Sequence, residues 1–437
     1  MNIRIAQKVE VNLPILILVL GLLVWVYVPI VGIFPLLLFV HLNKSYGNKK
    51  IEHLIKNIIL LIVLFTVTVF CCSREIYLDT AVYLNEYKRC AGDYFVECIE
   101  QTSETFEPAF YFLSSLFFII SRGSERGFLF LWSFTINFLT IFIICRGFSK
   151  KYHALLVMLT LCNPAFYMQT FLMRQFMAVS MFLCAIVTRR KKLLSCFYFI
   201  ASALNHYTSL IYLPFFLAAL ISGKNENQAK KVSNNYWRNY LLLMVLLICL
   251  GFTSSANKTL FGTILAALES TSIFSTAAQK GGFFLKQDNP GGLNGHSVLI
   301  PIISTVYIYI AIQLYKQRNL KSLRLNESEN FDKIVTSLYS AQVFFFVVAR
   351  GIDDQFALRL SLLLITYVGL FLYLPLEKHL LLGKLPSLSL LIMICSFMTL
   401  FFGNFLYNIS IGNLANFLEG EPFISLPGYI DYIGSNW

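Results

Sequence analysis

Two side chains that could do chemistry lie at the far ends of two neighbouring apolar segments. Arg174 and Gln175 begin the first segment, and Asn205 and His206 end the second. The short basic turn 189–192 joins the two segments. Because clusters of Lys and Arg stay on the cytoplasmic side of a membrane, Arg174 and His206 are predicted to face each other on the outer side. Charged groups are costly in lipid, so both should line a polar cavity.

Carboxylates and tyrosines in an acidic segment add further candidates. Asp79, Tyr83 and Tyr87 recur at every fourth position, which places them on one face of a helix. A carboxylate can take a proton from an attacking hydroxyl, so Asp79 is a candidate base. The alternative is that Asp79 caps this helix. Glu107 directly precedes Pro108, and this pair is also favourable at a helix start for structural reasons alone.

Two late arginines could help to bind an anion. Arg350 and Arg359 flank Asp353 and Asp354 near the start of an apolar segment. Guanidinium groups bind phosphate in a bidentate way, so arginines gathered on one side of a membrane suit an anionic lipid headgroup. The alternative for each arginine is snorkelling or pairing with a nearby acid. His206 has a comparable alternative, because a histidine at an interface is often satisfied by backbone groups.

Composition places the chain in the membrane. Of its 437 residues 57% are hydrophobic and 13% are charged, with a mean hydropathy of +0.67. Soluble domains carry about 25% charged residues. The net charge of +12 lies in short loops between apolar segments, which is the distribution expected of membrane topology and argues against a nucleic-acid partner. Cys90 and Cys98 lie in a polar loop, and the sequence leaves open whether they form a disulfide.

The fold class expected is an all-α polytopic membrane protein forming a single integral membrane domain over 1–437. About 13 helices (12 to 14) should cross, with the N-terminus inside and the C-terminus outside. Two short paired helices are expected within 13–42, where Pro29, Gly32 and Pro35 interrupt one long apolar run. The other crossings are expected at 57–72, 127–145, 152–168, 173–188, 193–206, 208–222, 239–253, 298–315, 334–349, 356–376 and 386–406.

Two outer loops are predicted. The first covers 73–126 and includes an apolar segment at 109–121 that is short for a crossing, so we expect a helix lying on the membrane or dipping into it. This choice places Arg122 and Arg126 outside and Arg146 inside. The second outer loop covers 254–297, and the last thirty residues should also lie outside.

Several protein classes lack their usual motifs here. The chain has no Walker loop, no HExxH and no GxSxG, which argues against an ATP-driven pump and a membrane metalloprotease. Its cysteine and histidine spacings predict no zinc or other metal site. No sustained internal repeat supports an inverted-repeat transporter.

The order of the motifs resembles that of the EpsG/Wzy-type polysaccharide polymerases over about 57–376. The ordered set comprises Asp79-xxx-Tyr83-xxx-Tyr87, Glu107-Pro108, Asn163-Pro164, Arg174-Gln175-xx-Ala178, a basic turn, Ala203-xx-His206-xx-Ser209, Pro214, and Arg359 followed by Tyr367. The chain departs from the family pattern before the acid, where it has Tyr77-Leu78-Asp79 instead of Gly-Thr-Asp.

The resemblance implies a GT-C-like integral membrane glycosyltransferase in the bacterial inner membrane. Such an enzyme joins undecaprenyl-pyrophosphate-linked oligosaccharides into O-antigen or capsular polysaccharide at the periplasmic face and needs no cofactor. Its partners would be these substrates, membrane lipid and, in some systems, a chain-length regulator. Asp79 or His206 would activate the acceptor. The groups that bind pyrophosphate and sugar would be Arg174, Arg359, Arg350, Gln175, Tyr83 and Glu107.

Three other functions use similar residues. An O-antigen ligase or another polyprenyl-phosphate-dependent glycosyltransferase would need the same Arg and His set. A flippase for lipid-linked units should carry charges at the bilayer midplane, whereas most charges here lie near the outer ends. A membrane O-acyltransferase would want its histidine deep in a helix and open to the cytosol. The sugars, the linkage, the stereochemistry, the choice between O-antigen and capsule, and the oligomeric state are open.

Overall fold

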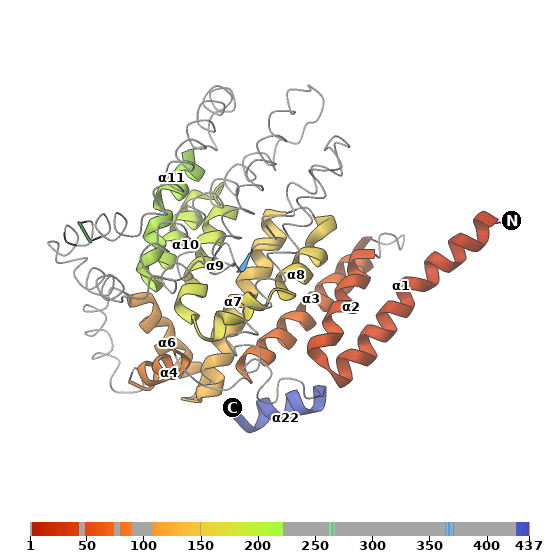
Figure 1. Ribbon diagram of the computed structural model, residues 1–437, viewed down its shortest axis with the longest axis horizontal. Coiled ribbons are helices and arrows are strands. Elements are labelled where there is room, and N and C mark those ends of the chain that lie inside the picture. Colours follow the sequence, from red (N-terminus) through yellow and green to blue (C-terminus); the bar gives the residue numbers. More distant parts are fainter. Residues whose placement is uncertain are drawn as a thin grey trace. The chain divides into compact units, whose positions relative to one another are not determined.

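The structure, a computed structural model, describes residues 2–42, 49–73, 79–89, 107–148, 150–221 and 425–436, with single positions at 262–263, 266, 363, 366–367 and 370. Every regular element in this part of the chain is a helix (Figure 1). The crossings expected from 239 to 406 and the outer loop 254–297 lie outside it, apart from those single positions. The chain forms two compact units: residues 1–99, 109–180 and 408–437 make unit 1, and residues 100–108 and 181–407 make unit 2.

The first two helices of unit 1 form a hairpin, α1 (Asn2–Tyr27) and α2 (Pro29–Leu42). Proline is favourable as the first residue of α2, because its missing N–H would have no intrahelical partner there. The helices approach so closely that a Cβ on Gly32 would lie 2.3 Å from the Cα of Trp25. The predicted break of the apolar run 13–42 into two closely paired helices is therefore confirmed, although α1 begins before this run and is 26 residues long rather than short.

Among the described residues of unit 1, two helices are long and apolar enough to cross a membrane, α3 (Lys49–Cys72) and α7 (Glu125–Gly147). They are antiparallel. At one end Arg126 donates to the carbonyl of Cys72 at 2.9 Å, and at the other Lys56 donates to the carbonyl of Lys150 at 3.4 Å. Residues predicted inside thus share one end of the pair, and residues predicted outside share the other.

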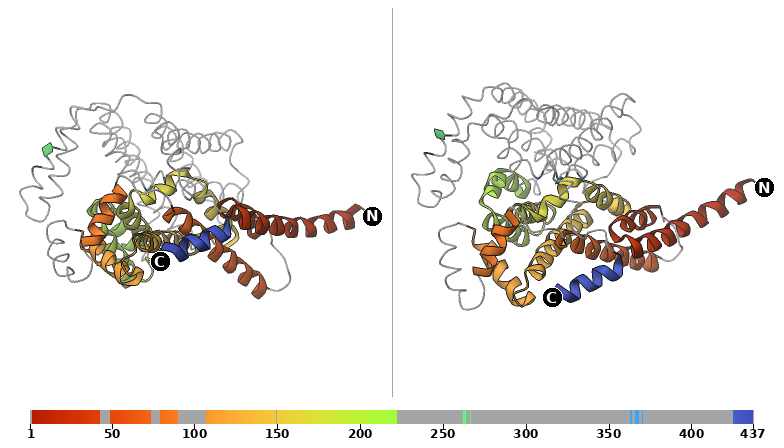
Figure 2. Two further views of the ribbon diagram at one scale, coloured as in Figure 1. Left: turned by 90° about the horizontal axis from the view of Figure 1, so that it is seen from below. Right: turned by 60° about the horizontal axis from the view of Figure 1, so that its bottom comes forward.

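A helix near the C-terminus, α22 (Leu426–Asn436), joins the end predicted to face outside. The Tyr432 hydroxyl donates to the carbonyl of Cys72 at 3.1 Å, and the Arg126 guanidinium lies 5.9 Å from the Tyr432 ring centroid. Figure 2 shows α22 in blue. The sequence did not predict this helix, and the outer position of the segment stays a prediction.

The segment expected to cross at 152–168 is not one helix. A 3₁₀ turn at Lys150–Tyr152 leads into α8 (His153–Leu161), and a second 3₁₀ segment, η3, covers Pro164–Thr170. Pro164 lacks an N–H, and its ring disfavours the helical conformation of Asn163, which explains the break. Apolarity alone predicted a crossing here, and the sequence Asn163-Pro164 was the signal against it.

Polar side chains link three elements inside unit 1. The Asn137 amide of α7 donates to Thr68 Oγ1 of α3 at 3.2 Å, and the Gln169 amide of η3 donates to Asn137 Oδ1 at 3.1 Å. All three residues are buried. Buried polar groups need such partners, so these two hydrogen bonds fix the position of η3 against α3 and α7.

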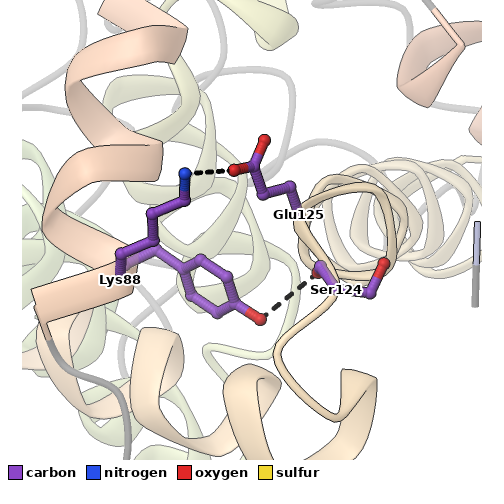
Figure 3. Close-up of polar contacts among 4 residues, drawn as sticks. Lys88, Ser124 and Glu125 are labelled. Atoms are coloured by element: carbon purple, nitrogen blue, oxygen red, sulfur yellow. Dashed lines mark hydrogen bonds and ion pairs between the residues drawn. The ribbon is translucent and has the colours of Figure 1, made fainter.

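Two shorter helices pack at the end of α7 that carries Arg126, α4 (Asp79–Arg89) and α6 (Pro108–Ser121). Tyr87 donates to the carbonyl of Ser124 at 3.3 Å, and Lys88 forms an ion pair with Glu125 (Figure 3). The prediction of a short helix at 109–121 is confirmed. The large side chains that α6 exposes are all apolar: Phe112, Leu116, Ile119 and Ile120.

Unit 2 contains the C-terminal half of α9 (Met173–Val187), then α10 (Lys192–Asn205), the 3₁₀ segment η4 (Tyr207–Tyr212) and α11 (Leu213–Ile221). Near the basic turn, Ser195 donates to the carbonyl of Ala185 at 2.7 Å. Phe199 stacks on Phe216 with ring centroids 4.3 Å apart. The boundaries predicted for α9 and α10 are confirmed to within one residue, whereas the first part of the predicted 208–222 helix is 3₁₀.

Candidate functional site

Arg174 is held against two aromatic rings in unit 1. It is the second residue of α9, and its Cζ lies 4.8 Å from the ring centroid of Tyr83 and 5.2 Å from that of Phe110. Both rings are buried, whereas Arg174 is half-buried. An aromatic face attracts a cation through its quadrupole, so the two rings stabilise the guanidinium in this position.

A cluster of buried aromatic residues supports those two rings. Phe110 of α6 packs edge-on against Trp132 of α7 at 5.2 Å between centroids, and Tyr87 of α4 stacks on Phe128 at 4.2 Å. The Tyr87 hydroxyl also lies 2.8 Å from Ser121 Oγ. Burial raises the pKa of the Tyr87 phenol, so it remains a neutral hydroxyl. Arg174 thus packs against a cluster of buried aromatic side chains from α4, α6 and α7.

Asp79 starts the helix that carries Tyr83, and this helix start lies beside the chain leading into α9. Thr80, the next residue, donates to the carbonyl of Thr170 at 2.5 Å, three residues before α9 begins. Asp79 is half-buried in the first turn of α4, where a carboxylate is favourable to the helix dipole. The structure therefore brings the predicted acid, Tyr83 and Arg174 into one region, together with the buried Gln175.

In unit 2 the structure pairs Glu107 with His206. The two residues are 99 positions apart, and the His206 Nδ1 lies 2.5 Å from Glu107 Oε1. The Glu107 side chain is 1% exposed and that of His206 is 12% exposed. A separation this short is typical of a charge-assisted hydrogen bond. Glu107 also directly precedes α6, the helix-start position expected of an acid followed by proline.

His206 has a fixed backbone as well as a fixed ring. It ends α10 with extended dihedral angles, and its N–H donates to the carbonyl of Ser202 at 3.1 Å. Asn205, fully buried, donates to the carbonyl of Ala201 at 3.0 Å and to Met181 Sδ at 3.4 Å. Because the carboxylate accepts from Nδ1, the Nε2 is the ring nitrogen that can take up or deliver a proton.

The sequence named both members of this pair but not the pairing. Glu107 was expected to bind substrate and His206 to act as a base, and no local pattern joins residues so far apart in the chain. The contact between Arg174 and the two rings was likewise not predicted. That Arg174 and His206 face each other stays a prediction. Arg350, Arg359, Cys90 and Cys98 lie outside the described residues.

The described part of the chain contains no cluster of side chains that could bind a metal ion. No group of three or more His, Cys, Asp or Glu side chains lies close enough there to hold a metal ion. The arrangements that are present suit two tasks: Arg174 can bind an anion, and the Glu107–His206 pair can move a proton.

The EpsG family model matches residues 56–418 of the 437-residue chain. No curated protein and no solved structure matches it. The family indicates a polysaccharide polymerase-type, glycosyltransferase-like function, and together with the apolar helices it indicates a membrane protein. A match over this much of the chain shows that the protein belongs to the EpsG family.

Proposed function

We propose that this protein polymerises undecaprenyl-pyrophosphate-linked oligosaccharide repeats at the periplasmic face of a bacterial inner membrane. Membership of the EpsG family supports the reaction class. One observation carries the assignment of roles. A buried carboxylate, Glu107, lies 2.5 Å from the ring of His206, which is the arrangement a general base requires.

Arg174 binds the pyrophosphate in this proposal. Its guanidinium lies at the N-terminus of α9, where the helix dipole also favours an anion, and two rings stabilise its position. As the sugar is transferred, negative charge builds on the departing pyrophosphate. A fixed donor aimed at such charge contributes about 2.7–4 kcal/mol to transition-state stabilisation. Arg350 and Arg359 remain proposed partners in this task.

His206 activates the acceptor. A hydroxyl at the non-reducing end of a new lipid-linked repeat attacks C1 of the first sugar of the growing chain. The C1–O bond to pyrophosphate breaks, the pyrophosphate leaves with the electron pair, and the hydroxyl proton passes to His206 Nε2. Glu107 accepts a hydrogen bond from Nδ1–H and so stabilises the imidazolium. We thus assign Glu107 a positioning role in place of the sugar contact expected from the sequence.

Asp79, Tyr83 and Gln175 complete the proposed substrate contacts. Asp79 lies in the same unit as Arg174, at the start of a helix whose next residue contacts the chain before α9. We propose that Asp79 binds a sugar hydroxyl and that His206 is the base. Asp79 remains the competing candidate for that role, and the two assignments differ in a measurable way.

The test uses the full-length protein in proteoliposomes supplied with purified lipid-linked repeats. We expect wild type to give products of many repeats, His206→Ala to give none, and Asp79→Asn to keep slow elongation. Glu125→Gln is the matched control, because this exposed surface acid lies outside the proposed site. Full chain elongation by His206→Ala would refute the base assignment. Single additions by wild type would point to a different glycosyltransferase.

A further inference from the structure

A cavity lies at the end of unit 1 away from Arg126 and Cys72. Its volume is about 640 Å³, and it is lined by α2, α3, the end of α7, and the start of α8. Sites for small organic ligands typically measure about 300–1,000 Å³, so the cavity is large enough for one. The sequence predicts that this end faces the cytoplasm, because Lys50, Arg146 and Lys150 lie there.

One wall of the cavity presents an oriented ammonium group. The Lys56 Nζ lies 3.0 Å from His153 Nδ1 and donates to the carbonyl of Lys150 at 3.4 Å. His153 Nε2 lies 3.0 Å from the carbonyl of Phe148, which can only accept. His153 therefore donates from Nε2 and accepts from Lys56 through Nδ1. An ammonium has three N–H donors, and among the described residues the third meets no protein acceptor.

The charge on this wall is positive. Lys56 and Lys150 carry two positive charges, against the one negative charge of Glu52. Glu52 lies one helical turn before Lys56, a spacing at which ion pairs commonly form. Among the described contacts, Glu52 attracts Lys56 electrostatically but forms no hydrogen bond or close ion pair with it, and the hydrogen bonds of Lys56 go to Lys150 and His153. An anion is therefore the ligand that this wall favours.

The rest of the lining is mixed: Phe39, Val40, Ile55 and Leu60 of α2 and α3 are apolar, and His41, His53 and Asn57 are polar. The neighbouring outer face of α3 also exposes large apolar side chains: Ile51, Leu54, Ile58 and Leu61. A ligand that fills this site would have an anionic head and an apolar tail. Anionic phospholipids of the cytoplasmic leaflet have this chemistry, and basic pockets between helices bind their headgroups.

We propose that this cavity binds the phosphodiester headgroup of an anionic phospholipid, through Lys56 and Lys150, with the acyl chains along the exposed face of α3. The lining of this cavity includes none of the residues to which the polymerase activity is assigned. Its test needs no substrate and no turnover, so the two proposals succeed or fail separately.

The experiment is native mass spectrometry of the full-length protein in detergent, with phosphatidylglycerol and phosphatidylcholine added in equal amounts. Wild type should retain phosphatidylglycerol in preference. Lys56→Gln/Lys150→Gln should bind phosphatidylglycerol about 10- to 100-fold more weakly, as expected for the loss of charged hydrogen bonds. The matched control is Lys191→Gln/Lys192→Gln, which removes the same charge from two exposed lysines of the basic turn and should leave binding within about twofold of wild type.

Two further measurements keep the result decisive. If the first double variant does not fold, Lys150→Gln alone replaces it, because that side chain is exposed, and it should still weaken binding. Inorganic phosphate at millimolar concentration is added as a competitor. Displacement of the lipid by phosphate alone would overturn the lipid assignment in favour of a free phosphate ligand. Equal binding by the two double variants, or no preference over phosphatidylcholine, would overturn the proposal.

Discussion

Replacing Glu107 with Gln removes one negative charge and almost no volume, so it isolates the role of the carboxylate. In the wild-type protein His206 Nδ1 lies 2.5 Å from Glu107 Oε1. The Gln side chain can still accept a hydrogen bond from Nδ1, but its oxygen is a neutral acceptor. A hydrogen bond to a charged group contributes about 1.5–3 kcal/mol. If that stabilisation is made in the transition state, the polymerisation rate should fall by about 10- to 150-fold.

The assay is steady-state elongation of lipid-linked repeats by the full-length variant in proteoliposomes, over a range of substrate concentrations. We expect kcat to fall while KM stays near that of wild type, because Glu107 is buried against His206 and acts through it. Glu107→Asp keeps the charge but shortens the side chain by one methylene, so it should fall between wild type and Glu107→Gln.

Glu125→Gln is the control for removing a carboxylate at a helix start. Glu125 pairs with Lys88 at the surface, with side chains 37% and 59% exposed, and such pairs contribute about 0–1 kcal/mol. Equal rates for Glu107→Gln and wild type, at equal protein level, would refute the assigned role of Glu107. Weaker substrate binding alone, seen as a higher KM at unchanged kcat, would instead support the substrate contact first expected of Glu107.

Three further predictions follow from the packing of unit 1. Arg174→Lys should lower elongation about 10- to 100-fold, because an ammonium loses both bidentate phosphate binding and ring stacking; wild-type polymer lengths from this variant would contradict the guanidinium's role. Gly32→Ala should destabilise the protein by about 1–3 kcal/mol in thermal unfolding, because the added Cβ would lie 2.3 Å from the Trp25 backbone. The control Gly434→Ala should be neutral, because nothing lies within 4 Å of its Cβ, and equal Tm values for the two variants would contradict the close approach of α1 and α2. Tyr87→Phe should lower the free energy of unfolding by about 1 kcal/mol, because the hydrogen bonds to Ser121 and Ser124 are lost. The control Tyr27→Phe changes an exposed side chain and should have no effect, and equal unfolding curves for the two variants would argue against this packing of α4.

The sequence predicted those parts of the fold that local patterns determine. Hydrophobic length and basic clusters predicted α7, α9 and α10 to within two residues and the end of α3, and the spacing of Asp79, Tyr83 and Tyr87 predicted α4. The start of α3 was predicted eight residues too late, because its first turns carry lysines and an acid. The break at Asn163-Pro164 was missed because apolarity dominated the interpretation, and α22 was missed because the last residues carry no long apolar run.

The candidate site was predictable as a set of residues but not as contacts. Residue type and position nominated Arg174, Glu107 and His206. The hydrogen bond between Glu107 and His206 depends on how segments 99 positions apart fold together, and nothing local in either segment indicates it. The same holds for the rings of Tyr83 and Phe110 at Arg174, which come from two other helices.

The central claim is that this member of the EpsG family makes polymer and uses Arg174 to do so. The most direct measurement is a gel of surface polysaccharide from a strain lacking the gene, complemented with wild type or with Arg174→Ala at equal protein level. We predict a full ladder with wild type and a collapse to single repeats with Arg174→Ala. An unchanged ladder in the deletion strain would contradict a polymerase function, and polymer retained on the lipid carrier but absent from the surface would point to a ligase.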